Sequence, residues 1–590
     1  MLLNDSQQRA VDHQAGHLLI VAGPGTGKTH TLTFRIARIS QQLEAGQRAL
    51  AITFTHKAAE ELRERFAKHF PPEVQEETFV GTFHSFCLSY LREHIHDTDL
   101  SKELNIATTH DLERLAGELW PDVPQRQLKK KLHAVMERKT RGSGGEISGE
   151  VAAYNAILKA NALLDYDDLL LEAGKLLSSR REPTGHARKT EFAHVFVDEY
   201  QDINALQHAL LKEFVRLGAT LTAIGDPHQA IYSFRGADVS FFERFAEDFK
   251  GATILSLSDN YRSAPNLLKA SGQIVTRETP LVSAVTADIY HQGQLTVYEA
   301  LADKAEAEYV VHQIEKILGG TSLFSRDSGR VTTTPSVARS FRDIAVLYRL
   351  NAQKSVLEAA LERHGIPYQA SDDRPFMELA PVPELVALLK DLRNAGTGFK
   401  PVPAGDTGAS NGGLQALMDK LPQTAAGEKI FKDSRPAWRK NVERFVRMAK
   451  RFDHLAEFLD YLALQQPEDA IERRAENVHL LTLHAAKGLE FPVVFIVGCE
   501  QNLLPLSIAN MVSDPEEERR LFYVGMTRAK EVLYLTHTRR RRLFGQGMSN
   551  PPSPYLGDIE HQLKEYDHAR PLLKRKPKPE FTQMEFFKIP

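Results

Sequence analysis

The sequence predicts an α/β protein with two lobes, each built on a parallel β-sheet and each interrupted by a mainly helical insertion. Short apolar runs bounded by turn residues alternate with segments of helical periodicity, the pattern of buried parallel strands. Four runs precede residue 230 and three follow residue 340, which fits two sheets better than one. A chain of 590 residues also exceeds what a single core supports. The runs are His17–Val21, Ala49–Phe54, His194–Val197, Leu221–Ile224, Ile344–Tyr348, Val493–Val497 and Val532–Thr536.

The insertions are expected where helical periodicity replaces these runs. Residues 90–190 are rich in Leu, Ala, Lys, Arg and Glu, with a glycine-rich break at Arg141–Gly149, and residues 375–475 contain the Gly/Pro/Ser-rich stretch Thr397–Gly413. The predicted boundaries are 1–90 and 185–265 for the first lobe, 91–184 for its insertion, 266–374 and 475–556 for the second lobe, 375–474 for a reduced second insertion and 557–590 for a C-terminal tail.

Composition excludes several classes of protein and suggests no function. The net charge of −3 gives no overall basic surface, so any nucleic-acid contact must come from a local groove. Only Cys87 and Cys499 could form a disulfide or hold zinc, and their spacing favours neither. No apolar run approaches the ~20 residues of a membrane span, and the N-terminus lacks a signal-peptide pattern. We therefore expect a cytoplasmic protein without a membrane partner.

A phosphate-binding loop follows the first predicted strand. The segment from Ala22 to Thr29 reads AGPGTGKT and leads into a helical stretch, so backbone N–H groups would face phosphates at a helix N-terminus. Lys28 would reach the β- and γ-phosphates and the Thr29 hydroxyl would bind Mg²⁺. Ala22 stands where the strict pattern has glycine. The expected nucleotide-binding residues of this segment are Ala22, Gly23, Gly25, Thr26, Gly27, Lys28, Thr29 and Thr31.

Two adjacent carboxylates end the strand predicted at His194–Val197. Asp198 would hold Mg²⁺ through its water shell, and Glu199 would polarise the attacking water. An acidic pair after a strand is a weak pattern alone, but it becomes strong when coupled to a phosphate-binding loop. These residues together predict a Mg²⁺-dependent ATPase.

Eight further segments occur in a fixed order, and their joint occurrence is very improbable by chance. They are Leu3–Gln7, Thr53–Ala59, Gly81–Ser85, Asp198–Asp202, Gly225–Gly236, Asn260–Arg262, Thr482–Phe491 and Tyr523–Arg528. The series resembles that of the UvrD/Rep/PcrA group of superfamily 1A DNA helicases and spans residues 3 to about 540. The resemblance implies two RecA-like P-loop NTPase lobes with ATP bound between them.

The resemblance assigns further roles around ATP. Gln7 would read the adenine edge, Tyr261 would stack on the base, and Glu490 would contact the ribose. Gln229 would sense the γ-phosphate. The catalytic residues would be Lys28, Asp198, Glu199, Gln229, Arg262 and Arg528, with both arginines supplied in trans by the second lobe.

DNA contacts are expected from aromatic and small polar residues at strand ends, which suit base stacking and phosphate binding. The candidates are Phe54, Thr55, Thr82, Phe83, His84, Tyr232, Phe234, Arg235 and His484. Taken singly, such aromatic residues are more often packed in cores or loops. That alternative stays open for each of them.

The predicted function is an ATP-dependent 3′→5′ translocase and helicase of single-stranded and 3′-tailed duplex DNA, acting in repair, replication or recombination in a bacterial or archaeal nucleoid. The polarity is implied by the resemblance only. One alternative is a translocase that clears proteins from DNA with little unwinding, since the second insertion is short. Another is the motor subunit of a helicase–nuclease. A P-loop kinase or transporter ATPase fits the paired arginines poorly.

The C-terminal tail carries one additional motif. Gln583–Phe587 (QMEFF) is similar to peptides that dock on the bacterial replication sliding clamp, and it follows a Lys/Pro-rich linker. Gln583, Phe586 and Phe587 would make the contact. The alternative is an apolar tail that packs on its own domain.

Overall fold

The computed structural model describes residues 3–568 except 15, 102–103, 141–148, 180–190, 276–291, 320–338, 371–373, 395–412, 466–468, 470–474 and 509–510. The glycine-rich core of Arg141–Gly149, most of Thr397–Gly413 and the clamp-like motif therefore lie outside the described residues. Among the residues that are described, no helix combines the length and apolar character needed to cross a bilayer.

The first lobe contains a six-stranded, fully parallel sheet in the order β3-β2-β6-β7-β1-β8. All four strands predicted for this lobe are present. The two edge strands, β3 and β8, were not predicted, and in β8 only the last residue is buried. The strand bounds are β3 Thr78–Thr82, β2 Arg48–Thr53, β6 Phe192–Val197, β7 Thr220–Gly225, β1 Leu18–Ala22 and β8 Thr253–Leu257.

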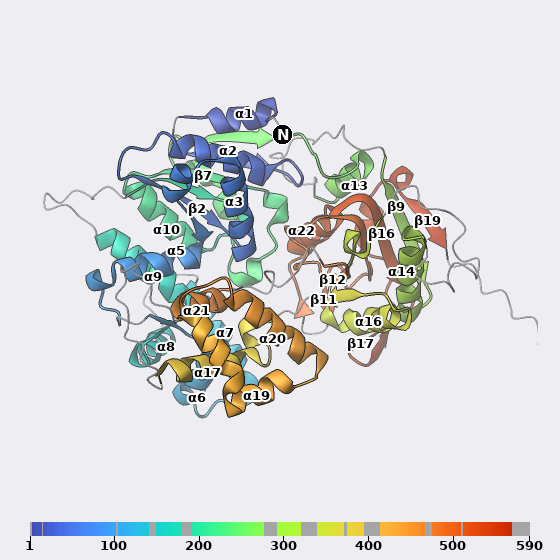
Figure 1. The fold of residues 1–590 in the computed structure, drawn as a ribbon. Helices are drawn as coiled ribbons and strands as arrows, with labels where there is room; N and C mark the ends of the chain where they lie inside the picture. The colour runs from blue at the N-terminus through green and yellow to red at the C-terminus, as the bar shows by residue number, and fades with distance from the viewer. Residues whose placement is uncertain are drawn as a thin grey trace, which may run out of the picture.

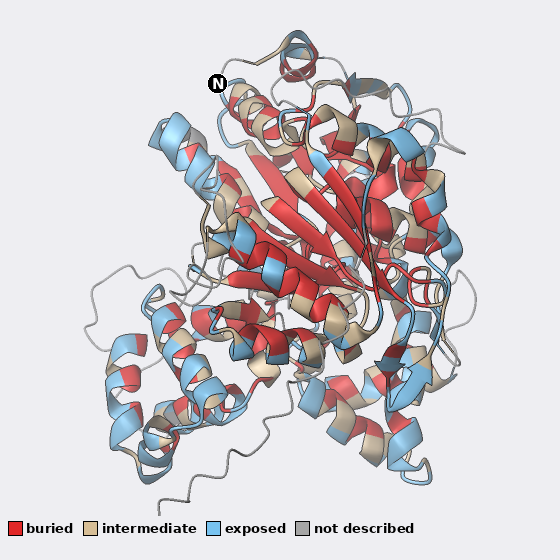
Figure 2. Ribbon diagram, turned by 90° about the vertical axis from the view of Figure 1, so that its right-hand side faces the viewer, coloured by how far each residue is buried: buried red, intermediate tan, exposed pale blue. Residues whose placement is uncertain are grey.

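Helices cover both faces of this sheet, because alternate strand residues point to opposite sides. In β1, Leu18 and Ile20 face a core shared with α1, α2 and α3, whereas Leu19 and Val21 face a core shared with α5, α9 and α10. Figure 2 shows the resulting buried strands between partly exposed helices. The helix bounds are α1 Asp5–Asp12, α2 Lys28–Ser40, α3 His56–His69, α4 Pro72–Glu76, α5 Phe83–Glu93, α10 Ala205–Arg216, α11 Ser240–Glu243 and α12 Phe245–Asp248.

The second lobe contains a seven-stranded, fully parallel sheet in the order β11-β12-β10-β13-β16-β9-β19. The three predicted strands form its centre, and the other four were not predicted. Its strands are β11 Tyr368–Ala370, β12 Val478–Thr482, β10 Ile344–Tyr348, β13 Phe491–Ile496, β16 Ala529–Thr538, β9 Gln294–Ala300 and β19 Glu565–His568. Its helices are α13 Pro265–Val275, α14 Asp303–Ile317, α16 Lys354–Arg363, α22 Pro515–Met526 and α23 Pro554–Asp558.

Both insertions are helical, and each has a hydrophobic core of its own. In the first insertion, α9 also packs into the core of the first lobe. The helices are α6 Thr109–Leu119, α7 Gln125–Thr140, α8 Gly149–Ala160 and α9 Tyr166–Ser179, followed in the second insertion by α17 Val382–Asn394, α18 Leu414–Lys420, α19 Ala425–Lys432, α20 Pro436–Ala449 and α21 Leu455–Ala463. Two-stranded pairs complete the fold: β4 Asn105–Ile106 with β5 Leu163–Leu164, β14 Ser507–Ile508 with β15 Met511–Val512, and β17 Arg541–Leu543 with β18 Gln546–Met548.

The second insertion lies against the first lobe and the first insertion, although the chain enters and leaves it from the second lobe (Figure 1). Asp460 on α21 pairs with Arg92 on α5. Arg451, just after α20, pairs with Glu60 on α3 at 2.7 Å. The Tyr166 hydroxyl on α9 donates to the backbone carbonyl of Ala463. The two lobes are therefore joined by this insertion as well as by their direct interface.

A buried charge cluster stabilises the second lobe. The Arg541 guanidinium lies 2.6 Å from Glu306 and 2.8 Å from Glu500, and all three side chains are at most 4% exposed. Replacing Arg541 by methionine leaves two buried carboxylates without their cation, so we expect the unfolding free energy of the second lobe to fall by about 3–5 kcal/mol. Urea denaturation followed by limited proteolysis measures this loss. The control is the same change at the exposed neighbour Arg540, and equal stability of the two variants would contradict the prediction.

Candidate ATP site and single-strand interface between the lobes

The phosphate-binding loop joins β1 to α2, and its glycines are required by their surroundings. Gly25 (φ +72°) and Gly27 (φ +82°) adopt the left-handed conformation that glycine tolerates best. A Cβ on Gly25 would lie 2.5 Å from the Cβ of Arg262, and one on Gly27 would lie 2.6 Å from Gln7 Nε2. Ala22 is the last, fully buried residue of β1 and adopts no left-handed conformation, so alanine fits there.

Gln7 is held against this loop at the first turn of α1. Its Nε2 donates to the Thr26 carbonyl at 3.0 Å, and its Oε1 accepts from the Asn4 backbone N–H at 3.1 Å. An amide has two donor hydrogens and two acceptor lone pairs. Half of the hydrogen-bonding capacity of Gln7 is therefore left for a purine edge.

The acidic pair Asp198 and Glu199 lies at the end of β6, beside the loop. With Thr29 and Lys487, both residues line a cavity of about 130 Å³ between the lobes. Glu199 has φ +51°, a conformation that costs a non-glycine residue on the order of 1–3 kcal/mol and is concentrated at functional sites. The chain therefore holds Glu199 in a strained turn at the end of β6.

The two carboxylates differ in charge state. Burial, together with the neighbouring Glu199 charge, raises the pKa of Asp198 to about 7. Burial also opposes ionisation of Glu199, but Lys28, Lys487 and a hydrogen bond from Gln201 outweigh it and lower the pKa of Glu199 to about 2. The surroundings thus favour the ionised form of Glu199 over that of Asp198.

Arg528 approaches the site from the second lobe as predicted. It is 1% exposed and donates to the carbonyls of Val524 and Leu489 at 2.9 and 3.0 Å. One guanidinium N–H also donates to Gln229 Oε1 of the first lobe at 3.4 Å. Burial and the nearby Arg262 lower the pKa of Arg528 to about 9, so it remains a cation at neutral pH.

Arg262 was expected to reach ATP from the second lobe, and the structure corrects this. It follows β8, the edge strand of the first sheet, and the preceding Asn260 donates to the Pro24 carbonyl of the phosphate-binding loop. Tyr261 donates its backbone N–H to Gly25 O at 2.8 Å and keeps an exposed ring. Arg262 therefore approaches from the junction of the lobes, and of the two arginines Arg528 alone comes from the second lobe.

Glu490 is engaged by cations in this structure. Its carboxylate lies 2.6 Å from Arg262 and 2.7 Å from Lys530. Burial opposes its ionisation, but Arg262 and Lys530 lower the pKa of Glu490 to about 2. A ribose contact would have to share this carboxylate with the two cations.

The loop 229–235 connects the ATP site to the predicted DNA contacts. Tyr232 stacks on Phe54 with ring centroids 5.1 Å apart, and Arg235 lies over the Tyr232 ring at 4.9 Å. Phe234 is 57% exposed and meets His484 of the second lobe edge-on at 5.5 Å. Of the predicted base platforms, Phe234 alone presents a largely open ring here, since Tyr232 is buried.

Four other predicted DNA contacts have structural roles. Phe83 is 4% exposed in the core of the first lobe, so its ring has no face for a base, and the prediction for it is wrong in this conformation. Thr55 and Thr82 cap α3 and α5 by accepting the backbone N–H groups of Ala58 and Ser85. His84 packs on Tyr166, and burial lowers the pKa of His84 to about 4.

Lys487 was not singled out from the sequence, although it lies inside the segment Thr482–Phe491. Its ammonium pairs with Asp202 and donates to the Gln229 carbonyl, both in the first lobe. Gln201 donates to Glu199 and accepts from the Asp226 backbone N–H at 3.0 Å. The Asp226 carboxylate in turn accepts from Gln229 at 2.7 Å, so the acidic pair is linked to the start of the loop 229–235. Position within the ordered segments was the only signal for these residues.

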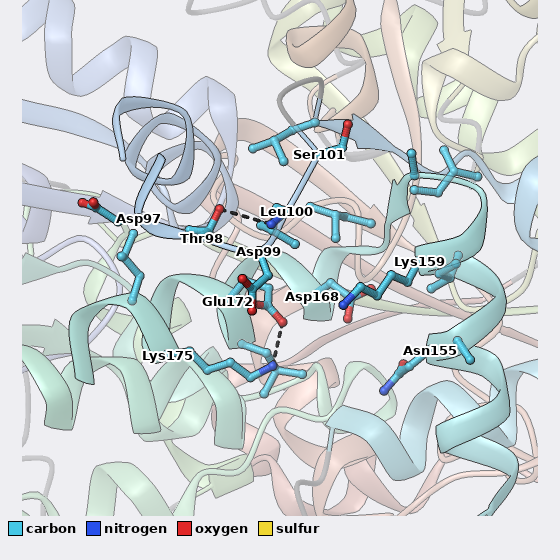
Figure 3. A pocket seen from close by; sticks show the side chains of 18 of the residues that line it. Asp97, Thr98, Asp99, Leu100, Ser101, Asn155, Lys159, Asp168, Glu172 and Lys175 are labelled. Carbon is cyan, nitrogen blue, oxygen red and sulfur yellow. Dashed lines mark hydrogen bonds and ion pairs between the residues drawn. The ribbon is translucent and has the colours of Figure 1, made fainter. Parts of the chain in front are cut away.

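A larger cavity, of about 610 Å³, lies in the first insertion and not in the interlobe cleft. Figure 3 shows its mixed acidic and basic lining, including the Glu172–Lys175 ion pair. Asp168, at its edge, is bound to the buried Lys139 at 2.6 Å. None of the predicted ATP or DNA residues lines this cavity, so we place the chemistry between the lobes.

Two parallel-sheet lobes with a phosphate-binding loop, an acidic pair and a buried arginine from the opposite lobe define a P-loop ATPase with its site between two lobes. Residues 3–250 match the family model for the UvrD/REP helicase N-terminal domain, and residues 255–398 and 414–540 match that for the UvrD-like helicase C-terminal domain. The chain belongs to the UvrD-like helicase family.

Curated relatives align over almost the whole chain. The ATP-dependent DNA helicase PcrA of Leuconostoc citreum is 30% identical, over 95% of this chain and 85% of its own length. PcrA of Bacillus subtilis is 29% identical, over 95% and 86%. DNA helicase II of Salmonella typhimurium is 28% identical, over 97% and 89%.

The close packing around Gly25 gives a direct test of the ATP site. In a Gly25→Ala variant the new methyl group displaces Asn260 and Arg262, so we expect kcat/KM for ATP to fall at least ~100-fold, as small misplacements of catalytic groups do. Steady-state ATPase assays measure the change. Gly46→Ala is the matched control, because Gly46 is also left-handed (φ +84°) but its new methyl group would have no described atom within 4 Å. A Gly25→Ala variant with the activity of Gly46→Ala would contradict the assigned geometry.

Proposed function

We propose that this protein is an ATP-driven motor that moves 3′→5′ along single-stranded DNA and unwinds 3′-tailed duplexes in DNA repair, replication or recombination. The observation that carries the proposal is the loop 229–235. At one end, Gln229 accepts from Arg528 across the ATP cleft, and five residues later Phe234 presents an exposed ring. Base–aromatic stacking is worth about 1–3 kcal/mol per base and tolerates any sequence. In this proposal, the loop 229–235 contacts ATP at one end and a DNA base at the other.

Mg²⁺ fits the residues beside the phosphate-binding loop. The Thr29 hydroxyl and the Asp198 carboxylate line the same cavity and are oxygen ligands of the type that Mg²⁺ prefers. The ion would neutralise phosphate charge. Glu199, whose carboxylate accepts from Gln201, is placed to orient and polarise the attacking water, and Lys28 and Arg528 supply positive charge from opposite lobes.

A second candidate is a translocase that displaces bound proteins but separates strands poorly. The observation in its favour is the position of the second insertion, which is bound to α3, α5 and α9. An insertion engaged in this way has less surface for a duplex ahead of the motor. The two candidates share the ATPase and differ in unwinding alone.

Lys28→Ala tests the motor. Losing the ammonium that faces the phosphates should lower the DNA-stimulated kcat by roughly 10³-fold and abolish unwinding, while single-strand binding persists. Phosphate release with and without single-stranded DNA is measured beside strand separation on 3′- and 5′-tailed duplexes. Lys68→Ala, at an exposed position on α3, is the control.

The outcomes separate the candidates. Unwinding of the 3′-tailed duplex alone supports the helicase with its proposed polarity. DNA-stimulated ATPase without unwinding of either substrate supports the protein-clearing translocase. An ATPase rate that single-stranded DNA does not raise, or that RNA raises and DNA does not, contradicts both candidates.

We further propose that the tail docks on the replication sliding clamp through Gln583, Phe586 and Phe587. Such a contact would bring the motor to DNA that carries the clamp. A peptide of residues 577–590 should bind purified bacterial clamp, and alanine at Phe586 and Phe587 should remove that binding. Isothermal titration of both peptides makes the comparison. Equal heats from the two, or none from the native peptide, would rule the contact out.

A further inference from the structure

Helix α22 of the second lobe lies along the loop 229–235 of the first lobe. Two residues of α22 and one just after it contact the loop in reverse order. Glu517 near the start of the helix accepts from Ser233, and Arg520 one turn later donates to the Ala230 carbonyl at 2.7 Å. Arg528, just after the helix, donates to Gln229. A rigid helix is thus fixed to the loop at both ends.

The contact at Glu517 is the most specific of the three. Its Oε1 accepts the Ser233 backbone N–H at 2.9 Å, and its Oε2 accepts the Ser233 hydroxyl. Glu517 is only 9% exposed, and hydrogen bonds to a buried charged group are among the stronger ones in proteins. Because Ser233 directly precedes Phe234, the two bonds fix the backbone that carries the exposed ring.

The next residue of the helix fixes a second element. Glu518 binds the Arg349 guanidinium at 2.6 Å and accepts the Leu506 backbone N–H at 3.1 Å. Arg349 is close enough to His484 to help lower the pKa of that histidine. The N-terminal turn of α22 therefore fixes Ser233, next to Phe234, through Glu517, and fixes Arg349 through Glu518.

We propose that Glu517 is a positioning residue that couples Phe234 to the ATP-facing Arg528 through α22. When Arg528 moves with the second lobe, the helix transmits the movement to Ser233 and so to the Phe234 ring. The inference rests on the proposed DNA motor and goes further, because it names the residue through which nucleotide state reaches the base platform. Glu517 does not line the cavity between the lobes.

The substitutions that test this separate hydrogen bonding from bulk. Glu517→Ala removes both acceptors, whereas Glu517→Gln keeps an amide oxygen for the Ser233 N–H and an NH₂ for its hydroxyl. Ser233→Ala removes one of the two bonds. Glu516→Ala is the matched control, because the neighbouring Glu516 side chain is 56% exposed and makes only a 4.0 Å contact with Arg519.

Two readouts are measured on the full-length protein with an oligo-dT carrying one 2-aminopurine. The first is the DNA concentration for half-maximal ATPase stimulation. The second is the change in 2-aminopurine fluorescence on adding a non-hydrolysable ATP analogue, which reports base stacking. We expect Glu517→Ala to raise the DNA concentration for half-maximal stimulation about 10-fold or more. The same substitution should remove the fluorescence change. For Glu517→Gln this DNA concentration should stay within about threefold of the native value. The value for Ser233→Ala should lie between those of Glu517→Gln and Glu517→Ala.

KM for ATP should change less than about threefold in every variant, since the contact lies on the DNA side of the loop. A parallel rise in KM for ATP, or equal loss in the alanine and glutamine variants, would show general damage and overturn the inference. A Glu517→Ala protein that matches Glu516→Ala would overturn it too. If the native protein shows neither DNA stimulation nor a fluorescence change, the DNA motor fails first.

Discussion

Insertion of the loop 229–235 into the opposite lobe is the constraint on which the functional site depends. Ile231 and Tyr232 belong to the first lobe by connectivity but are buried in the core of the second, beside Leu521 and Phe522 of α22. Burying two large side chains contributes about 1.5–3 kcal/mol each, more than an exposed polar contact would. This packing sets the distance between Arg528 and Gln229 and leaves Phe234 at the rim. The candidate ATP site and the Phe234 ring are therefore parts of one interface between the lobes.

Charge balance completes that interface. Lys487 enters from the second lobe and pairs with Asp202, while its charge also helps to keep the neighbouring Glu199 ionised. Arg262 is similarly balanced by Glu490. A buried cation is costly unless it is paired. The second lobe therefore supplies the cation Lys487 and the carboxylate Glu490, and each lies beside a group of opposite charge at the cleft.

The central strands and the glycine-rich turn after β1 were predictable because their signals are local. Continuous apolar runs mark strands buried on both faces, and glycines at Gly25 and Gly27 mark a backbone that only they fit. Edge strands such as β8 alternate or expose their residues, so they lack that signal. Phe83 and Arg262 show the other limit. A residue's type and motif were visible in the sequence, but which core its ring enters, or which lobe carries its guanidinium, depends on packing between distant segments.

The placement of the second insertion has a geometric consequence. It is covalently part of the second lobe, yet Asp460 and Arg451 bind it to α5 and α3 of the first. The insertion is therefore held by the first lobe through noncovalent contacts and by the second lobe through the chain itself. Any separation of the two lobes must either break the contacts to α5 and α3 or be taken up where the chain passes between the insertion and the second lobe.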